Sequence, residues 1–69
     1  MFELYYKMIN EENSVLMKFD NEDELYEFLD DCLNIDYNEL SIDLLKKYKN
    51  IEVMILNDGN GNIIVDYMR

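Results

Sequence analysis

The spacing of apolar residues changes twice along this chain, and this change restricts the fold more than any other feature. Over residues 2–9, 15–19, 51–55 and 63–67, apolar residues occupy every second position. Over residues 25–33 they recur at every third or fourth position instead. Period two is typical of a strand with one buried face, and a period near 3.6 is typical of an amphipathic helix. The sequence therefore predicts strands at both ends and a helix in the middle.

Polar segments between the strands predict two hairpins. Residues 10–13, NEEN, are typical of a turn between the first two strands. Residues 57–62, NDGNGN, supply glycines and asparagines that tolerate the positive φ angles of tight turns. The first two strands and the last two strands are therefore each expected to pair with one another.

The helical region is expected to contain two helices. Asp20 or Asn21 is a suitable N-cap for the first, with an acidic residue three positions later. Residues 35–38 predict a break, and a shorter helix then runs from Glu39 or Ser41 to Tyr48. The first helix is expected to bury Leu25, Phe28, Leu29, Cys32 and Leu33, and the second Leu40, Leu44, Leu45 and Tyr48. The last turn carries Lys46, Lys47 and Lys49, which suit the negative end of a helix dipole.

The order of elements is therefore β-β-α-α-β-β in a single domain over residues 1–69. An antiparallel sheet of about four strands with one or two helices on one face is the natural α+β arrangement. The expected inward residues of the last two strands are Ile51, Val53 and Ile55, and Ile63, Val65 and Tyr67. Apolar residues also occur out of phase, at Met54, Leu56, Ile64 and Met68. A sheet that is apolar on both sides indicates that a partner or a second copy covers its outer face.

Catalysis and metal binding are disfavoured by what the sequence lacks. The 69 residues include no histidine, no phosphate-binding glycine-rich loop, and only two serines without a recognisable triad partner. Residues 58–63, DGNGNI, look like the middle of an EF-hand calcium loop, but that alignment puts Leu56 and Tyr67 at ligand positions. We therefore expect no enzyme activity, no cofactor and no metal, and we interpret this segment as a hairpin turn.

The overall charge also limits the partners. A net charge of -10 repels anionic membranes and nucleic acids alike. No apolar run approaches the about 20 residues that cross a bilayer, and residues 1–7 do not have the pattern of a signal peptide. A single cysteine, Cys32, suits a reducing compartment and is expected to pack in the core. We expect a cytoplasmic protein that binds neither membrane nor nucleic acid directly.

The negative charge is concentrated in one segment. Residues 20–43 contain ten of the 16 carboxylates and no lysine or arginine, whereas acids and bases balance over the rest of the chain. At 100° per residue, six of the ten fall within about 120° of helix surface, opposite the apolar stripe. These are Asp20, Asp23, Glu24, Glu27, Asp30 and Asp31, and Asp36 and Glu39 extend the negative surface beyond them.

A charged helix face is often only solvated, but this one differs from an ordinary solvated face. Such faces alternate Glu with Lys, because opposite charges four residues apart stabilise a helix by about 0.2–0.5 kcal/mol and like charges destabilise it similarly. Here Asp23 and Glu27, and Glu27 and Asp31, are like-charged pairs at that spacing. Asp30 and Asp31 also lie toward the helix C-terminus, where the dipole opposes them. The pattern favours a binding role over bulk solubility.

The segment DNEDELYEFLDD, together with the small size and acidity, resembles the DNA-mimic inhibitors that phages and other mobile elements encode. Members of that class, anti-CRISPR proteins among them, are non-enzymatic and occupy the nucleic-acid site of a host protein. The resemblance implies a basic nucleic-acid-binding partner such as a CRISPR effector or a nucleoid protein. It also implies action in the cytoplasm, which is the host's if the source is a phage, and often a homodimer. The six helix carboxylates would then take the place of phosphates, with Asp36 and Glu39 beside them.

A second hypothesis comes from a different class of protein. A small accessory domain could bind its partner, or a second copy, through the apolar outer face of the sheet. In that case the acidic helix would only keep the assembly soluble. The two hypotheses differ in which surface must be intact for binding.

Overall fold

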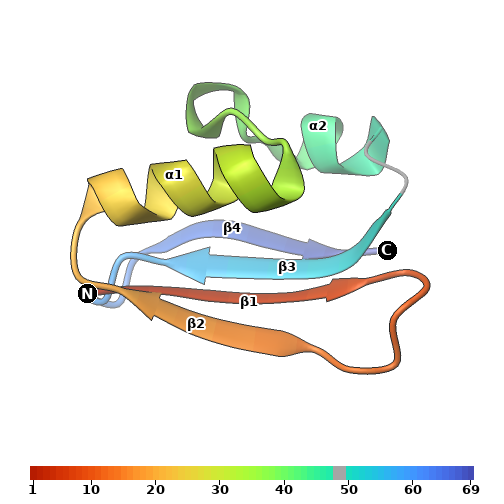
Figure 1. Cartoon of the computed structure of the whole chain (residues 1–69), viewed down its shortest axis with the longest axis horizontal. Helices are drawn as coiled ribbons and strands as arrows, with labels where there is room; N and C mark the ends of the chain where they lie inside the picture. Colours follow the sequence, from red (N-terminus) through yellow and green to blue (C-terminus); the bar gives the residue numbers. More distant parts are fainter. Residues whose placement is uncertain (48–49) are drawn as a thin grey trace.

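A computed structural model of the chain describes residues 1–47 and 50–69 (Figure 1). A four-stranded antiparallel sheet is covered on one face by two helices, so the structure confirms the α+β class and the order β-β-α-α-β-β. The elements are β1 (Phe2–Met8), β2 (Val15–Phe19), α1 (Glu22–Leu33), the 3₁₀ turn η1 (Tyr37–Glu39), α2 (Ile42–Lys47), β3 (Ile51–Asn57) and β4 (Ile63–Met68).

Both predicted hairpins form, and a third pairing joins them. β1 pairs with β2, β3 pairs with β4, and β1 pairs with β3, all antiparallel, which gives the order β2-β1-β3-β4. Leu4 of β1 lies opposite Met17 on one side and Leu56 on the other. The first and third strands are therefore the centre of the sheet, and each hairpin supplies one central strand and one edge strand.

The core lies between the sheet and the helices. Leu25, Leu29 and Leu33 of α1 are buried against it, as the period of the stripe predicted. Each of these leucines contributes about 1.5–3 kcal/mol by leaving water. The other buried apolar residues are Leu4, Phe19, Ile35, Leu45, Ile51, Met54, Leu56, Val65 and Tyr67.

The prediction of which β3 residues face the core is confirmed for Ile51 and wrong for Val53 and Ile55. Lys7 lies opposite Val53 but Met8 lies opposite Ile51, so one extra residue, Glu52, is inserted in β3. An extra residue reverses the alternation of side chains between the two faces. Ile51 is therefore buried as expected, whereas Val53 and Ile55 point away from the helices. Met54 and Leu56, predicted to face outward, are fully buried in the core.

Two further core predictions are wrong, at Cys32 and Ile63. Cys32 is exposed, on the flank of the buried stripe of α1. Phe28, one turn earlier on the same flank, lies 5.5 Å from the ring of Phe19 and 6.1 Å from the ring of Tyr6. Ile63 is 63% exposed at the start of β4, where the register between β3 and β4 shifts.

The second helix, α2, starts at Ile42, next to the predicted start at Ser41, and the structure describes it as far as Lys47. It begins after Ser41, whose hydroxyl accepts a hydrogen bond of 3.1 Å from the backbone N–H of Leu44. Leu45 is buried, and Leu40 and Leu44 are partly buried beside it. The predicted last turn includes Tyr48 and Lys49, which lie outside the described residues. None of the helices in residues 1–47 and 50–69 has the length and apolar character needed to cross a membrane.

Candidate functional site

The exposed side of α1 is the candidate site. Its buried stripe faces the sheet, and the carboxylates between the stripe residues point away from it on the opposite side. All of these carboxylates are exposed, and each has at least one acidic neighbour three or four residues away. We call this surface the acidic face, and it consists of Asp23, Glu24, Glu27, Asp30 and Asp31.

Local interactions hold this helix in place at both ends. The side chain of Asn21 accepts a hydrogen bond of 3.0 Å from the N–H of Glu24, so the N-cap is Asn21, one of the two predicted residues. Glu24 in turn accepts from the N–H of Asp20 at 3.2 Å. At the other end Asn34 adopts the left-handed conformation, with φ of 55°, and Ile35 donates to the carbonyl of Leu29 at 2.9 Å. The acidic face therefore belongs to a helix with defined ends.

The acidic face has no cation beside it among the described residues. The ion pairs found in residues 1–47 and 50–69 are on the sheet: Lys7–Glu52 at 2.7 Å and Lys18–Glu3 at 3.9 Å. The last turn of α1 contains no basic residue. The five carboxylates thus repel one another, at a cost of about 0.2–0.5 kcal/mol per neighbouring pair. Asp23 and Glu24 stabilise the first turn of the helix, whereas Glu27, Asp30 and Asp31 make no such contribution to folding.

The structure divides the eight predicted binding residues into three groups. Five form the acidic face. Asp20 precedes the helix and lies outside that face, although its backbone N–H bonds to Glu24 in the first turn. Asp36 and Glu39 belong to the segment after α1, where Asp36 accepts a hydrogen bond of 2.9 Å from the N–H of Asn38. All eight are exposed.

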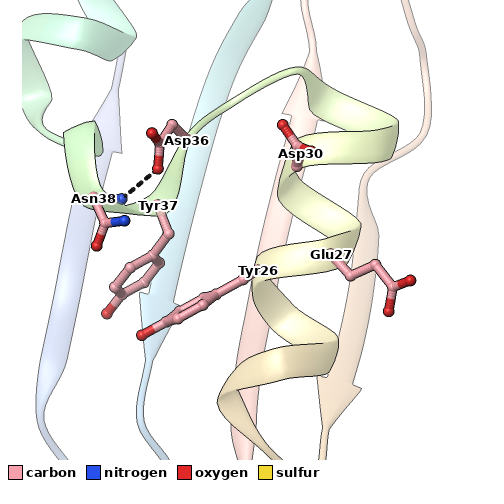
Figure 2. Close-up of a pocket in the computed structure, with 6 residues that line it drawn as sticks. All are labelled: Tyr26, Glu27, Asp30, Asp36, Tyr37 and Asn38. Atoms are coloured by element: carbon pink, nitrogen blue, oxygen red, sulfur yellow. Dashed lines mark hydrogen bonds between the residues drawn. The ribbon is translucent and has the colours of Figure 1, made fainter.

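A groove between α1 and the following segment is lined by three of these carboxylates and by two tyrosines (Figure 2). Its volume is about 380 Å³. In Figure 2, Asp30 and Asp36 lie at one end of the groove, and Glu27 points to the other side of the helix, away from the tyrosines. The lining residues are Tyr26, Glu27, Asp30, Asp36, Tyr37 and Asn38.

The tyrosine pair is a feature that the sequence analysis missed. Tyr26 and Tyr37 stack with ring centroids 4.3 Å apart and an angle of 29° between the planes. The hydroxyl of Tyr26 donates to Glu22 at 2.8 Å, one helical turn earlier, and this bond raises the pKa of Tyr26 to about 12. The spacing of Glu22 and Tyr26 could have indicated the bond. No sequence pattern indicated the stacking, because Tyr37 lies beyond the helix break.

The face of the sheet opposite the helices is a second exposed surface (Figure 1). We call it the open sheet face. The alternation of side chains along paired strands places seven apolar residues on it, and five of them are substantially exposed. The seven are Tyr5 of β1, Leu16 of β2, Val53 and Ile55 of β3, and Ile63, Ile64 and Met68 of β4.

In the segment that resembles a calcium loop, residues 58–63, the carboxylate of Asp58 accepts hydrogen bonds from other residues of the segment. Asp58 accepts from the N–H of Asn60 at 2.8 Å and from the side-chain amide of Asn62 at 2.9 Å. The Asn62 bond, then the backbone bond from Asn60, lowers the pKa of Asp58 below its ordinary value. Gly59 and Gly61 have φ of 82° and 90°, as a hairpin turn requires. Within the described ranges, no group of three or more Cys, Asp or Glu side chains is placed to hold a metal.

Comparisons with protein-family models, with curated proteins and with solved structures each found no match to the chain. The function must therefore be argued from the two exposed surfaces themselves, the acidic face of α1 and the open sheet face.

Proposed function

We propose that this protein is a non-enzymatic inhibitor that binds a basic site on a nucleic-acid-binding protein through the acidic face. The observation that carries the proposal is the placement of five exposed carboxylates on one side of a capped helix, with no cation beside them in the described part of the chain. Such an array is unfavourable for the isolated protein. It becomes favourable when a cationic partner neutralises it.

The spacing of the charges supports competition with nucleic acid. α1 rises about 1.5 Å per residue, so five carboxylates from Asp23 to Asp31 lie along about 12 Å. A DNA duplex carries one charge per about 1.7 Å of its axis. A channel lined with Lys and Arg that attracts phosphates would therefore attract this face too. Association through it is expected to be fast and sensitive to salt.

The residues beside the acidic face would extend the contact. Asp36 lies at the groove next to Asp30, and Asp20 and Glu39 lie before and after the helical face. The partner class that this charge pattern fits is a protein with a preformed basic channel, such as a CRISPR effector or a nucleoid protein. Such partners work in the cytoplasm, which is where the inhibitor would act.

The test is a charge reversal on the acidic face with a matched control. Glu27→Lys with Asp31→Lys should abolish capture of a nucleic-acid-binding protein from a bacterial lysate and leave the fold intact. Glu11→Lys with Glu12→Lys makes the same change in net charge in the exposed β1–β2 turn and should retain capture. The partner bound by the unaltered protein should elute in a salt step and be displaced by added duplex DNA or guide RNA.

Either of two results would contradict the proposal. In the first, the Glu27 and Asp31 variant still captures the partner. In the second, both double variants lose it equally, which would make net charge alone responsible. Circular dichroism and denaturant midpoints of both variants establish that they are folded.

The open sheet face favours a second candidate function, that of an accessory domain that binds through this face. Leu16 is 62% exposed and Met68 is 74% exposed, so the face is apolar and accessible. In this case Met68→Asp would abolish partner capture and the acidic-face variant would bind normally. The two double variants and this single variant together separate the two functions.

A further inference from the structure

The groove between α1 and the segment that follows it has two chemically different ends (Figure 2). The stacked rings of Tyr26 and Tyr37 lie at one end, and the exposed carboxylates of Asp30 and Asp36 lie at the other. The groove volume of about 380 Å³ is within the range of about 300–1,000 Å³ that is usual for ligand sites. We propose that this groove binds one arginine side chain of the basic partner, with the guanidinium between the carboxylates and the rings.

The tyrosine stack is an aromatic surface that is already in place. Tyr26 and Tyr37 contact each other through one face of each ring, with 4.3 Å between the centroids, so the opposite faces are not used by the pair. Both side chains are half-buried against the core, and the hydroxyl of Tyr26 donates to Glu22 at 2.8 Å. These contacts hold the rings in position before a partner arrives. A cation within about 6 Å of a tyrosine ring is attracted by the negative charge of the ring face.

The carboxylates at the other end of the groove have unused capacity to accept hydrogen bonds. Asp36 accepts one bond of 2.9 Å from the N–H of Asn38, whereas an ionised carboxylate has about four acceptor positions. The ion pairs found in the described part of the chain involve neither Asp30 nor Asp36. A cation that enters the groove would therefore meet two carboxylates that no lysine or arginine of this part neutralises.

The combination of rings and carboxylates favours a guanidinium over other cations. A divalent metal would need several oxygen ligands, and no group of three or more Cys, Asp or Glu side chains is placed to hold one in the described residues. A lysine ammonium is a compact and strongly hydrated charge that gains little from the rings. A guanidinium is planar, is more weakly hydrated, donates five hydrogen bonds and stacks on aromatic rings. It is the cation that uses both ends of the groove.

The groove adjoins the acidic face, because Asp30 belongs to both. Glu27 also lines the groove, but in Figure 2 it points to the other side of the helix, where it belongs to the acidic face alone. A single partner can therefore place cations along the acidic face and one arginine in the groove. The acidic face attracts any positive surface, whereas the groove selects a surface with an arginine at the matching place. The inference rests on the proposed function, because it names the side chain by which the basic partner is held.

The experiment compares two pentapeptides of equal charge. One consists of five lysines, and the other has an arginine in place of the central lysine, so they differ in a single guanidinium. Both should bind the acidic face at low salt. The arginine peptide should bind about threefold to tenfold more tightly, as expected for a cation held against a partly exposed ring. Isothermal titration calorimetry measures both dissociation constants, and their ratio is the readout.

Single substitutions in the groove should remove this preference. Tyr37→Leu removes a ring and keeps an apolar side chain, and Asp36→Asn removes a charge but keeps the oxygen that accepts from Asn38. Each should lower the ratio toward one. Tyr5→Leu on the open sheet face and Asp43→Asn on α2 are the matched controls at exposed positions outside the groove. Both controls should leave the ratio unchanged.

Two results would overturn the inference. In the first, the unaltered protein binds the two peptides equally. In the second, the ratio persists in both Tyr37→Leu and Asp36→Asn, which would place the preference outside the groove. Asp30→Asn, at an exposed position of α1, should also lower the ratio. This variant decides the question alone if circular dichroism shows that the other two do not fold.

Failure of this inference differs from failure of the proposed function. If only the groove is wrong, the two peptides bind equally, while Glu27→Lys with Asp31→Lys still abolishes capture of a nucleic-acid-binding protein from the lysate. If only the class of partner is wrong, the arginine peptide binds more tightly and Tyr37→Leu removes the preference, but no nucleic-acid-binding protein is captured.

Discussion

The two exposed surfaces of this molecule differ in every property that matters for binding. The acidic face carries five carboxylates of one sign on a single helix. The open sheet face carries seven apolar side chains, and the acids Glu3 and Asp66 on it are balanced by Lys7 and Lys18. If charge served only solubility, it would be expected on the apolar surface, which needs it most. The proposed binding role of the acidic face would account for the concentration of charge on the other side.

The largest expected effect on stability comes from a cavity in the core, which lies between these two surfaces. Leu29 is fully buried between α1 and the sheet, so Leu29→Ala leaves a cavity and should lower the free energy of unfolding by about 2–5 kcal/mol. Leu16→Ala, on the open sheet face, should change it by less than about 0.5 kcal/mol. Urea denaturation measures both. Equal losses would mean that Leu16 is part of a second core in the monomer.

A smaller effect comes from screening the acidic face. Repulsion among neighbouring carboxylates should make the free energy of unfolding rise by about 0.5–1 kcal/mol between low salt and about 1 M NaCl. The Glu27→Lys and Asp31→Lys variant should lose most of this rise, because three of the four neighbouring pairs become attractive and only the pair between positions 27 and 31 stays like-charged. Denaturation at several salt concentrations tests this. An undiminished rise in the variant would place the repulsion elsewhere in the chain.

The smallest effect concerns the edge of the acidic face, at Tyr26. Its hydrogen bond to Glu22 raises the pKa to about 12 from an ordinary value of 10.0, so the neutral phenol is favoured in the folded protein. The resulting stabilisation is complete below about pH 10 and is lost as the pH rises toward 12. Glu22→Gln should return this tyrosine toward its ordinary pKa.

Ultraviolet absorbance of tyrosinate follows this titration. The deprotonation step near pH 12 should be absent in Tyr26→Phe. The difference between the titration curves of this variant and of the unaltered protein isolates Tyr26 from the other tyrosines. A curve for Glu22→Gln that matches that of the unaltered protein would show that Glu22 does not cause the shift.

Much of the fold was predictable because it follows from local patterns. Asn21 as N-cap, the buried leucines of α1 and both hairpin turns depend on residues that are close in sequence. The exposed carboxylates of α1 were predictable for the same reason, since helix geometry alone fixes which residues share a side. Whether they bind a partner stays a prediction.

Other features were not predictable, because they depend on contacts between distant segments. The extra residue at Glu52 is defined only by the pairing of β3 with β1, and it decides that Met54 is buried in the core while Ile55 lies on the open sheet face. The stacking of Tyr26 on Tyr37 depends on the path of the chain after Asn34.

The sequence by itself therefore determined the elements, their order, and the side of α1 on which the charge is gathered. These depend on the spacing of apolar residues, on helix capping and on turn residues, all of which act over a few positions of the chain. The tertiary structure alone decided the central pairing of β1 with β3, and with it the composition of the open sheet face. Strand pairing fixes register across the whole chain, and a single inserted residue reverses which side chains meet water.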